Sequence, residues 1–132
     1  MSEPAPSVPP RVLVVDDAGL VRIYYRGVLE RAGFAVDEAL NGIEALERVL
    51  AGPYDLLVVD VNMPRMDGLS FLRALRRREA PWRALPVLMT STEAGAGDRE
   101  AARAAGASFY LVKPVAEGDL VAHARALAGW RP

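Results

Sequence analysis

The sequence predicts a doubly wound α/β protein, with a five-stranded parallel sheet and five helices on its two faces. Short apolar runs of strand length alternate five times with segments whose apolar residues recur at helical spacing. The runs are apolar at every position, which is typical of strands covered on both faces in a parallel sheet. The length of 132 residues favours a single domain, because a chain of this size can bury one core.

The first two strand–helix units are predicted by their apolar patterns. A run of apolar, mostly β-branched residues at 12–15 predicts a buried strand. Apolar residues then recur at helical spacing from Leu20 through Ile23, Tyr24 and Val28, and Gly33 is expected just after the helix ends. The second unit follows, with a less apolar strand at 34–39, expected nearer a sheet edge, and a helix at 43–50.

The remaining three units repeat this pattern. A continuous apolar run at 56–59 predicts the third strand, which ends in Asp60. The third helix is expected at 68–79, and Asp67 is placed to cap it. The last two units have strands at 86–89 and 109–112 and helices at 98–106 and 120–127, the first of these helices capped by Asp98.

The two ends of the chain differ from the rest in composition. Residues 1–10 contain four prolines and have no apolar period, which predicts a disordered or extended tail. We therefore expect the folded domain at residues 11–128, followed by a short C-terminal end at 129–132.

Composition excludes several classes of protein. With 52% hydrophobic residues the chain is too apolar to be disordered, and no apolar run approaches the roughly 20 residues that span a bilayer. The first residues lack the basic and apolar segments of a signal peptide, so a cytoplasmic protein without membrane insertion is expected. The absence of Cys excludes disulfides and thiolate metal sites. A net charge of −1 argues against nucleic acid as the main partner.

Polar residues follow four of the apolar runs. They are Asp16 and Asp17 after the first run, Asp60 after the third, Thr90 after the fourth, and Lys113, the one Lys of the chain, after the fifth. Ligands of such sheets bind beyond the carboxyl ends of the strands, so these side chains are expected to meet there. Carboxylates about 5 Å apart repel by roughly 3 kcal/mol per pair at an effective dielectric of about 20. Such a cluster needs a cation, and oxygen ligands of this kind suit Mg²⁺.

Four motifs lie at these strand ends. They are Leu-Val-Val-Asp-Asp at 13–17, Val-Asp-Val-Asn-Met-Pro-Arg-Met-Asp-Gly at 59–68, Met-Thr-Ser at 89–91, and Tyr-Leu-Val-Lys-Pro at 110–114 after Gly-Ala at 106–107. In this order they resemble the receiver domains of response regulators, of the stand-alone CheY type. The resemblance runs from about residue 11 to residue 128 and implies the strand order 2-1-3-4-5 of flavodoxin-like and CheY-like sheets.

The resemblance implies a phosphorylation site with a metal. Asp60 is then the phospho-acceptor, and an ionised carboxylate at an open edge of the sheet suits a nucleophile. Asp17 would bind Mg²⁺ directly, and Asp16 would lie close to the metal, partly through water. Asn62, two residues after Asp60, would offer its backbone carbonyl to the metal.

The resemblance also implies a set of groups that respond to the phosphoryl group. Thr90 would donate a hydrogen bond to one phosphoryl oxygen, and Lys113 would pair with another. An Arg at this position would present a planar fork in place of a compact charge, which gives a physical reason for the lone Lys. Tyr110 matches an aromatic switch that turns inward as Thr90 moves toward the phosphoryl group. The peptide bond between Lys113 and Pro114 is expected to be cis.

The implied function is that of a single-domain response regulator in two-component signalling, not an enzyme. A sensor histidine kinase would phosphorylate the protein, which would then bind a protein target through the fourth helix, fifth strand and fifth helix. The chain ends after the fifth helix, which is expected for a stand-alone receiver. Chemotaxis is favoured, with a flagellar motor switch as target and a monomeric protein. Two alternatives stay open: a phosphorelay intermediate acting on a histidine phosphotransfer protein, and a degenerate receiver that serves as a binding module.

Two other functions of such folds fit the residues less well. A flavodoxin that binds FMN needs hydroxyls and glycines in its first phosphate loop, whereas Asp16 and Asp17 would repel a phosphate. A metal-dependent phosphatase needs a substrate pocket and usually a cap insertion, for which this length leaves no room. Within the resemblance, Ser91 stands where Ala is common and Thr92 where chemotaxis proteins often have Glu. The rate of dephosphorylation is therefore not predicted.

Overall fold

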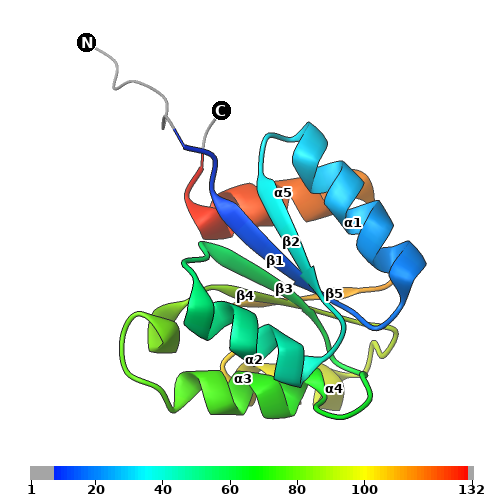
Figure 1. The fold of residues 1–132 in the computed structure, drawn as a ribbon. Helices are drawn as coiled ribbons and strands as arrows, with labels where there is room; N and C mark the ends of the chain where they lie inside the picture. The colour runs from blue at the N-terminus through cyan, green and yellow to red at the C-terminus, as the bar shows by residue number, and fades with distance from the viewer. Residues whose placement is uncertain (1–7, 131–132) are drawn as a thin grey trace.

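The computed structural model describes residues 8–130, whose arrangement is shown in Figure 1. Of the predicted tail and C-terminal end, residues 1–7 and 131–132 lie outside the described residues. Five parallel strands form one sheet in the order β2-β1-β3-β4-β5, which confirms the predicted fold and strand order. The strands are β1 (Arg11–Val15), β2 (Ala35–Ala39), β3 (Leu56–Asp60), β4 (Val87–Ser91) and β5 (Phe109–Val112).

Five helices cover the two faces of the sheet (Figure 1). An apolar core lies between the sheet and the helices on each side. Helices α1 and α5 pack on one face, and α2, α3 and α4 pack on the other. None of the helices within residues 8–130 is long and apolar enough to cross a membrane. The helices are α1 (Gly19–Arg31), α2 (Gly42–Ala51), α3 (Gly68–Arg76), α4 (Ala96–Ala105) and α5 (Glu117–Ala128).

Alternation along β4 decides which side chains face which layer of helices. Leu88 packs in the core under α1 and α5, and Met89 packs in the core under the other three helices. Thr90 lies two residues after Leu88 and therefore points to the α1 and α5 face. Asp60 of β3 pairs with Thr90 in register, so both side chains point to that face.

The buried face of α1 differs from the one predicted. Leu20, Ile23 and Tyr24 are exposed by 83%, 66% and 41%, whereas Tyr25 and Leu29 are buried together with the correctly predicted Val28. Both sets of residues fit a helical period, so the sequence pattern alone does not decide between them. The helix turns the second set toward the sheet, which brings a tyrosine into the core.

Helix α3 ends at Arg76, and not at residue 79 as predicted. At this end the Arg76 guanidinium donates two hydrogen bonds to the Gly106 carbonyl (3.0 and 2.9 Å). It also donates to the Arg83 carbonyl (3.1 Å), which belongs to a 3₁₀ turn at Trp82–Ala84 that the sequence reasoning missed. The polar residues after Arg76 carry no apolar period that would mark this end.

Helix α4 begins at Ala96 and has Gly95 as its cap, which makes the prediction of Asp98 as the capping residue wrong. The Gly95 carbonyl accepts hydrogen bonds from the Asp98 and Arg99 N–H groups. Asp98 lies inside the first turn, where its carboxylate faces the positive end of the helix dipole. The predicted stop after α1 is confirmed, because Gly33 has a φ of 100°.

Candidate functional site

The polar residues predicted at the strand ends meet at one edge of the sheet. The backbone stays in register just beyond the strands: the Val61 N–H donates to the Thr90 carbonyl (2.9 Å), and the Lys113 N–H donates to the Ser91 carbonyl (2.8 Å). The residues that follow β3 and β5 are thus held level with the end of β4. This alignment brings side chains far apart in the sequence to the same edge.

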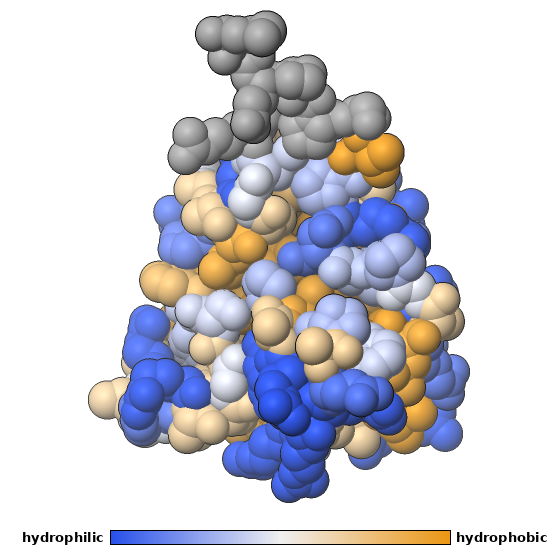
Figure 2. Space-filling view, turned by 90° about the vertical axis from the view of Figure 1, so that its left-hand side faces the viewer, coloured by the Kyte–Doolittle hydropathy of each residue, from blue (hydrophilic) through white to orange (hydrophobic). Residues whose placement is uncertain are grey.

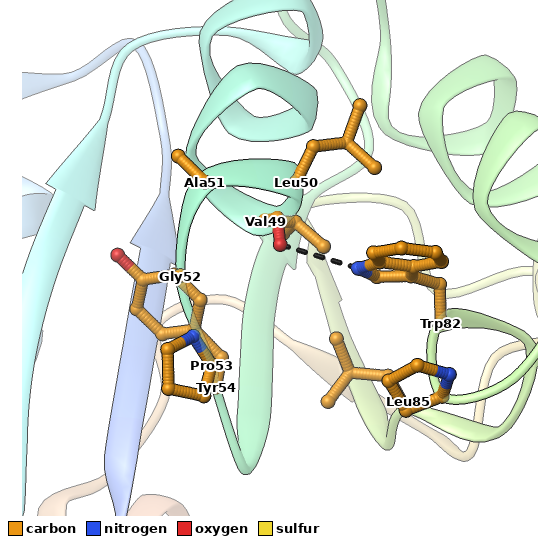
Figure 3. A pocket seen from close by; sticks show the side chains of 9 residues that line it. Val49, Leu50, Ala51, Gly52, Pro53, Tyr54, Trp82 and Leu85 are labelled. Atoms are coloured by element: carbon orange, nitrogen blue, oxygen red, sulfur yellow. Dashed lines mark hydrogen bonds between the residues drawn. The ribbon is translucent and has the colours of Figure 1, made fainter.

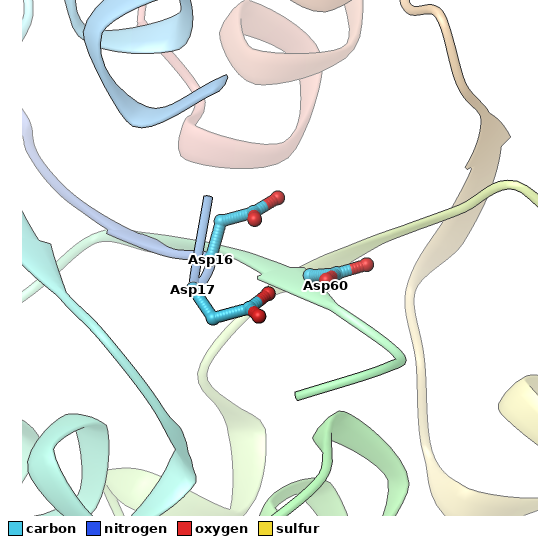
Figure 4. Close-up of side chains that lie close together, drawn as sticks. All are labelled: Asp16, Asp17 and Asp60. Atoms are coloured by element: carbon cyan, nitrogen blue, oxygen red, sulfur yellow. The ribbon is translucent and has the colours of Figure 1, made fainter. Parts of the chain in front are cut away.

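Three carboxylates form the centre of this edge (Figure 4). Asp16 and Asp17, just after β1, and Asp60, at the end of β3, each place an oxygen within 4.8 Å of the others. Asp16 is 1% exposed and Asp60 is 6% exposed, whereas Asp17 is open to solvent. Oxygen ligands at this spacing and with this access are compatible with a site for a hard divalent cation.

Lys113 is the cation that faces the two buried carboxylates. Its Nζ lies 2.7 Å from Asp16 Oδ2 and 3.2 Å from Asp60 Oδ1. Burial lowers the pKa of Lys113, but the hydrogen bond to Asp16 and the charge of Asp60 outweigh this effect and raise the pKa above its usual value. The ammonium therefore stays charged and offsets one of the negative charges.

The carboxyl group of Asp60 has a raised pKa. Burial and the charge of Asp16 raise its pKa to about 6, although Lys113 and the backbone N–H of Asn62 lower it. Without a further cation, ionisation of the Asp60 carboxyl group at neutral pH therefore lowers the free energy of unfolding. The same arrangement would favour binding of a cation.

The Thr90 hydroxyl has no partner in this structure. The side chain is fully buried, and its Oγ1 is the one buried side-chain polar atom within residues 8–130 that lacks a hydrogen bond. An unsatisfied buried hydroxyl costs about 1–3 kcal/mol. A ligand oxygen bound beside Asp60 would satisfy it.

Asn62 and Tyr110 both line a cavity of about 210 Å³ beside the site. Asn62 is exposed just past Asp60. Tyr110 is 7% exposed, and its hydroxyl donates to the Glu93 carbonyl (2.6 Å). The Glu93 N–H in turn donates to the buried Ser91 Oγ (3.0 Å), so the aromatic ring is already inside and tied to the loop after β4.

Two peptide bonds before proline are cis within residues 8–130. The bond between Lys113 and Pro114 is cis, as the sequence resemblance implies, and the bond between Ala80 and Pro81 was not predicted.

Sequence reasoning missed two residues of α1 that touch the site. Arg22 donates from Nη1 to the Asp16 carbonyl (2.6 Å) and from Nε to Glu38 (3.0 Å), which fixes the chain just after β1. Tyr25 is 2% exposed and, together with Lys113, lines a cavity of about 250 Å³. The one signal that could have identified Tyr25 is its phenol group, which stands on the same helix face as the apolar residues Val28 and Leu29.

Gly68 has no room for a side chain, because its Cβ would clash with the Asp60 carbonyl oxygen and approach Met89 Cε to 3.0 Å. We expect Gly68→Ala to lower the free energy of unfolding by about 1–3 kcal/mol, since the end of β3 must move. The measurement is urea denaturation. Gly97→Ala is the control, because nothing lies within 4 Å of a Cβ there. A Gly68→Ala protein as stable as wild type would contradict the close contact.

A second cavity lies away from the carboxylates, where α2 ends (Figure 3). It has a volume of about 400 Å³ and is lined mainly by apolar side chains, with Trp82 Nε1 donating to the Val49 carbonyl (3.2 Å). The surface on this side of the molecule mixes apolar and hydrophilic side chains (Figure 2). Asp16, Asp60 and Lys113 are not among the residues that line this cavity.

Comparison with known proteins agrees with the geometry. The model of the response regulator receiver domain matches residues 12–125. The transcriptional regulatory protein PrrA of Mycobacterium leprae is 42% identical over 118 residues, which are 89% of this chain and 49% of PrrA. The transcriptional regulatory protein ResD of Bacillus subtilis is 36% identical over 117 residues, which are 89% of this chain and 47% of ResD. The chain therefore spans about half the length of these curated relatives.

Solved structures show the same fold. The chemotaxis response regulator CheY4 of Vibrio cholerae has a TM-score of 0.85 and 32% identity, covering 91% of this chain and 99% of CheY4. A putative response regulator from Chloroflexus aurantiacus has a TM-score of 0.87 and 31% identity, covering 92% of this chain and 98% of that protein. With the family model matching most of its length, the chain belongs to the response regulator receiver domains of two-component systems.

Proposed function

We propose that this protein is a phosphorylation switch in which Asp60 accepts a phosphoryl group from a sensor histidine kinase. The single observation that supports this most is the pairing of the buried Asp60 with Lys113 at 3.2 Å, beside a buried Thr90 hydroxyl that has no partner. A nucleophile, an ammonium and a free hydroxyl are what transfer of a charged phosphoryl group needs.

The proposed transfer balances its bonds and charges. An Asp60 oxygen attacks phosphorus, the P–N bond of the phosphohistidine breaks, and the electron pair stays on the histidine nitrogen, which takes up a proton. Lys113 stabilises one phosphoryl oxygen by charge, and Thr90 donates its hydroxyl proton to another. The acyl phosphate replaces one negative charge on Asp60 with about two, which biases the groups around it toward a second arrangement.

Mg²⁺ is the metal that we propose for the acidic cluster. Asp16, Asp17 and Asp60 would hold it, with the backbone carbonyl of Asn62 as a further ligand, and these hard oxygen donors fit that ion. When bound, the ion supplies positive charge that neutralises the carboxylates and the phosphoryl oxygens. The access that Asp17 has to solvent leaves space for metal-bound water.

We expect the wild-type protein to gain one phosphoryl group from acetyl phosphate in the presence of Mg²⁺. Intact-protein mass measures the gain, with and without the metal. Asp60→Asn, which removes the nucleophile and keeps the shape, is expected to show no gain. Failure of the wild-type protein to gain mass under any condition would contradict the proposal for small donors and would favour a degenerate receiver that acts by binding alone.

For the output we propose a protein target of the chemotaxis type, with the protein acting as a monomer in the cytoplasm and not as an enzyme. PrrA and ResD are named as transcriptional regulators and CheY4 as a chemotaxis protein, so relatives of both kinds exist. The target would bind to the surface of α4, β5 and α5, where Phe109 is 47% exposed and its ring centroid lies 4.4 Å from that of His123.

Radiolabelled phosphoryl groups distinguish the possible outputs. If the protein binds a flagellar motor switch, the label stays on Asp60 and binding increases on phosphorylation. If it is a phosphorelay intermediate, the label passes to a histidine phosphotransfer protein in a mixing experiment. Transfer of the label would replace the chemotaxis assignment with the relay.

A further inference from the structure

Arg22 of α1 links the acidic cluster to strand β2. Its guanidinium donates from Nη1 to the Asp16 carbonyl (2.6 Å) and from Nε to Glu38 Oε1 (3.0 Å). The Arg22 side chain is 16% exposed, so these hydrogen bonds are largely shielded from water. One planar group thus joins the chain just after β1 to β2, its neighbour in the sheet.

The partners of Arg22 indicate that it holds the backbone and does not serve as a counter-ion of the cluster. Within residues 8–130, its side chain donates to a backbone carbonyl and to Glu38, and to none of the three clustered carboxylates. Arg22 is also the fourth residue of α1, near the positive end of the helix dipole, where a cation is unfavourable. Its position therefore has a cost that the contacts with Asp16 and Glu38 offset.

Glu38 keeps the Arg22 guanidinium in place. Its Oε1 accepts from Arg22, and its Oε2 accepts from Arg26 Nη1 (2.8 Å). The hydrogen bonds from Arg26 and Arg22 hold the pKa of Glu38 below its usual value, although burial raises it, so the carboxylate stays charged. Both oxygens of Glu38 are engaged in charge-assisted hydrogen bonds, which restricts the orientation of Arg22.

The segment that Arg22 holds carries two of the three clustered carboxylates. The Asp16 N–H donates to the Ala39 carbonyl (3.2 Å), and the Ala18 N–H donates to Asp16 Oδ1 (2.9 Å). The Asp16 carbonyl belongs to the peptide group that joins Asp16 to Asp17, so the hydrogen bond from Arg22 fixes the plane of this group. Asp17 is exposed and lies beside Asp16 and Asp60 (Figure 4). Its place in the cluster therefore depends on that peptide group.

We propose that Arg22 is a positioning residue for the metal site, which holds the Asp16–Asp17 peptide group so that the Asp17 carboxylate stays where it can bind Mg²⁺. This inference rests on the Mg²⁺ site of the proposed function. Arg22 is not itself a ligand of the ion. Residues that orient metal ligands in this way typically change metal affinity about 10- to 100-fold when they are substituted.

Arg22→Met tests this inference, because it removes the donors and keeps an unbranched side chain. We expect the Kd for Mg²⁺, measured by isothermal titration calorimetry on the folded protein at pH 8, to rise about tenfold. Charge alone predicts the opposite, since removal of a cation near the site should strengthen binding of another cation. An unchanged or lower Kd in Arg22→Met would overturn the inference.

Arg26→Met is the matched control. It removes a second guanidinium that donates to Glu38, but the hydrogen bonds of Arg26 go to Glu30 and Glu38 and not to Asp16. Circular dichroism establishes that both variants are folded before titration. The Kd for Mg²⁺ should stay near the wild-type value in Arg26→Met. Equal rises of the Kd in the two variants would overturn the inference, because the effect would then not come from the contact with Asp16.

Two further outcomes separate this inference from the proposed function. A wild-type protein that binds Mg²⁺ more tightly than Arg22→Met, but gains no phosphoryl group from acetyl phosphate, would contradict the phosphorylation switch and support the positioning role of Arg22. A wild-type protein that binds no Mg²⁺ would contradict the proposed metal and would overturn the inference with it.

Discussion

Lys113→Met is expected to destabilise the metal-free protein by about 3–5 kcal/mol at pH 8, because it removes one partner of a buried ion pair and leaves the other charged. The ammonium lies 2.7 Å from Asp16, which is 1% exposed, and 3.2 Å from Asp60. The Met side chain has a similar length and keeps the packing of the stem. Urea denaturation in the presence of a chelator measures the change.

Two comparisons identify the cause of this loss. At pH 5 the loss should become smaller, because Asp60, whose pKa is about 6, takes up a proton and no longer needs a counter-charge. Adding Asp60→Asn to Lys113→Met should recover part of the stability at pH 8 for the same reason. A Lys113→Met protein with the same deficit at both pH values would show that the loss comes from packing and not from charge.

Asp60→Asn is expected to stabilise the metal-free protein above pH 6 while abolishing phosphorylation. Burial and Asp16 raise the pKa of Asp60 from 3.8 to about 6 in the folded state. The folded protein therefore binds more protons than the unfolded chain between these values, and the free energy of unfolding falls as the pH rises through this window. Across this window the free energy of unfolding of the wild-type protein falls by about 3 kcal/mol relative to that of Asp60→Asn, which has no titrating carboxyl group at this position.

Urea denaturation between pH 4 and pH 8, with a chelator present, measures this difference. The wild-type protein should lose stability across the window relative to Asp60→Asn, and the two curves should converge near pH 4. Glu79→Gln, at an exposed carboxylate after α3, is the control and should follow the wild-type curve. Parallel curves for wild type and Asp60→Asn would contradict a raised pKa at this position.

Much of the site could be predicted because the sheet is parallel. Continuous apolar runs mark buried strands, and the carboxyl ends of parallel strands lie at one edge, so the residues that follow the runs must meet. This reasoning correctly brought Asp60 and Lys113 together, although 53 residues separate them in the chain (113 − 60). The prediction that these two residues meet required only that the strands be parallel and lie in one sheet, and no knowledge of distances between atoms.

Other features could not be predicted because they depend on the rotation of a helix or on contacts made by backbone groups. The apolar residues of α1 allow two faces, and only packing against the sheet buries Tyr25 and exposes Ile23. At the end of α3, Arg76 forms hydrogen bonds with the carbonyl of Gly106, a residue of a later unit. Local patterns carry no information on such partners.

The sequence by itself determined the fold class and the identity of the polar groups at the edge, because strand and helix periodicity are local properties of the chain, and the resemblance of its motifs implied the strand order. Tertiary structure alone decided the raised pKa of Asp60, the partnerless hydroxyl of Thr90 and the burial of Tyr25. Burial and interaction energies depend on distances between residues brought together by packing, and electrostatic effects in a low-dielectric interior change steeply with those distances.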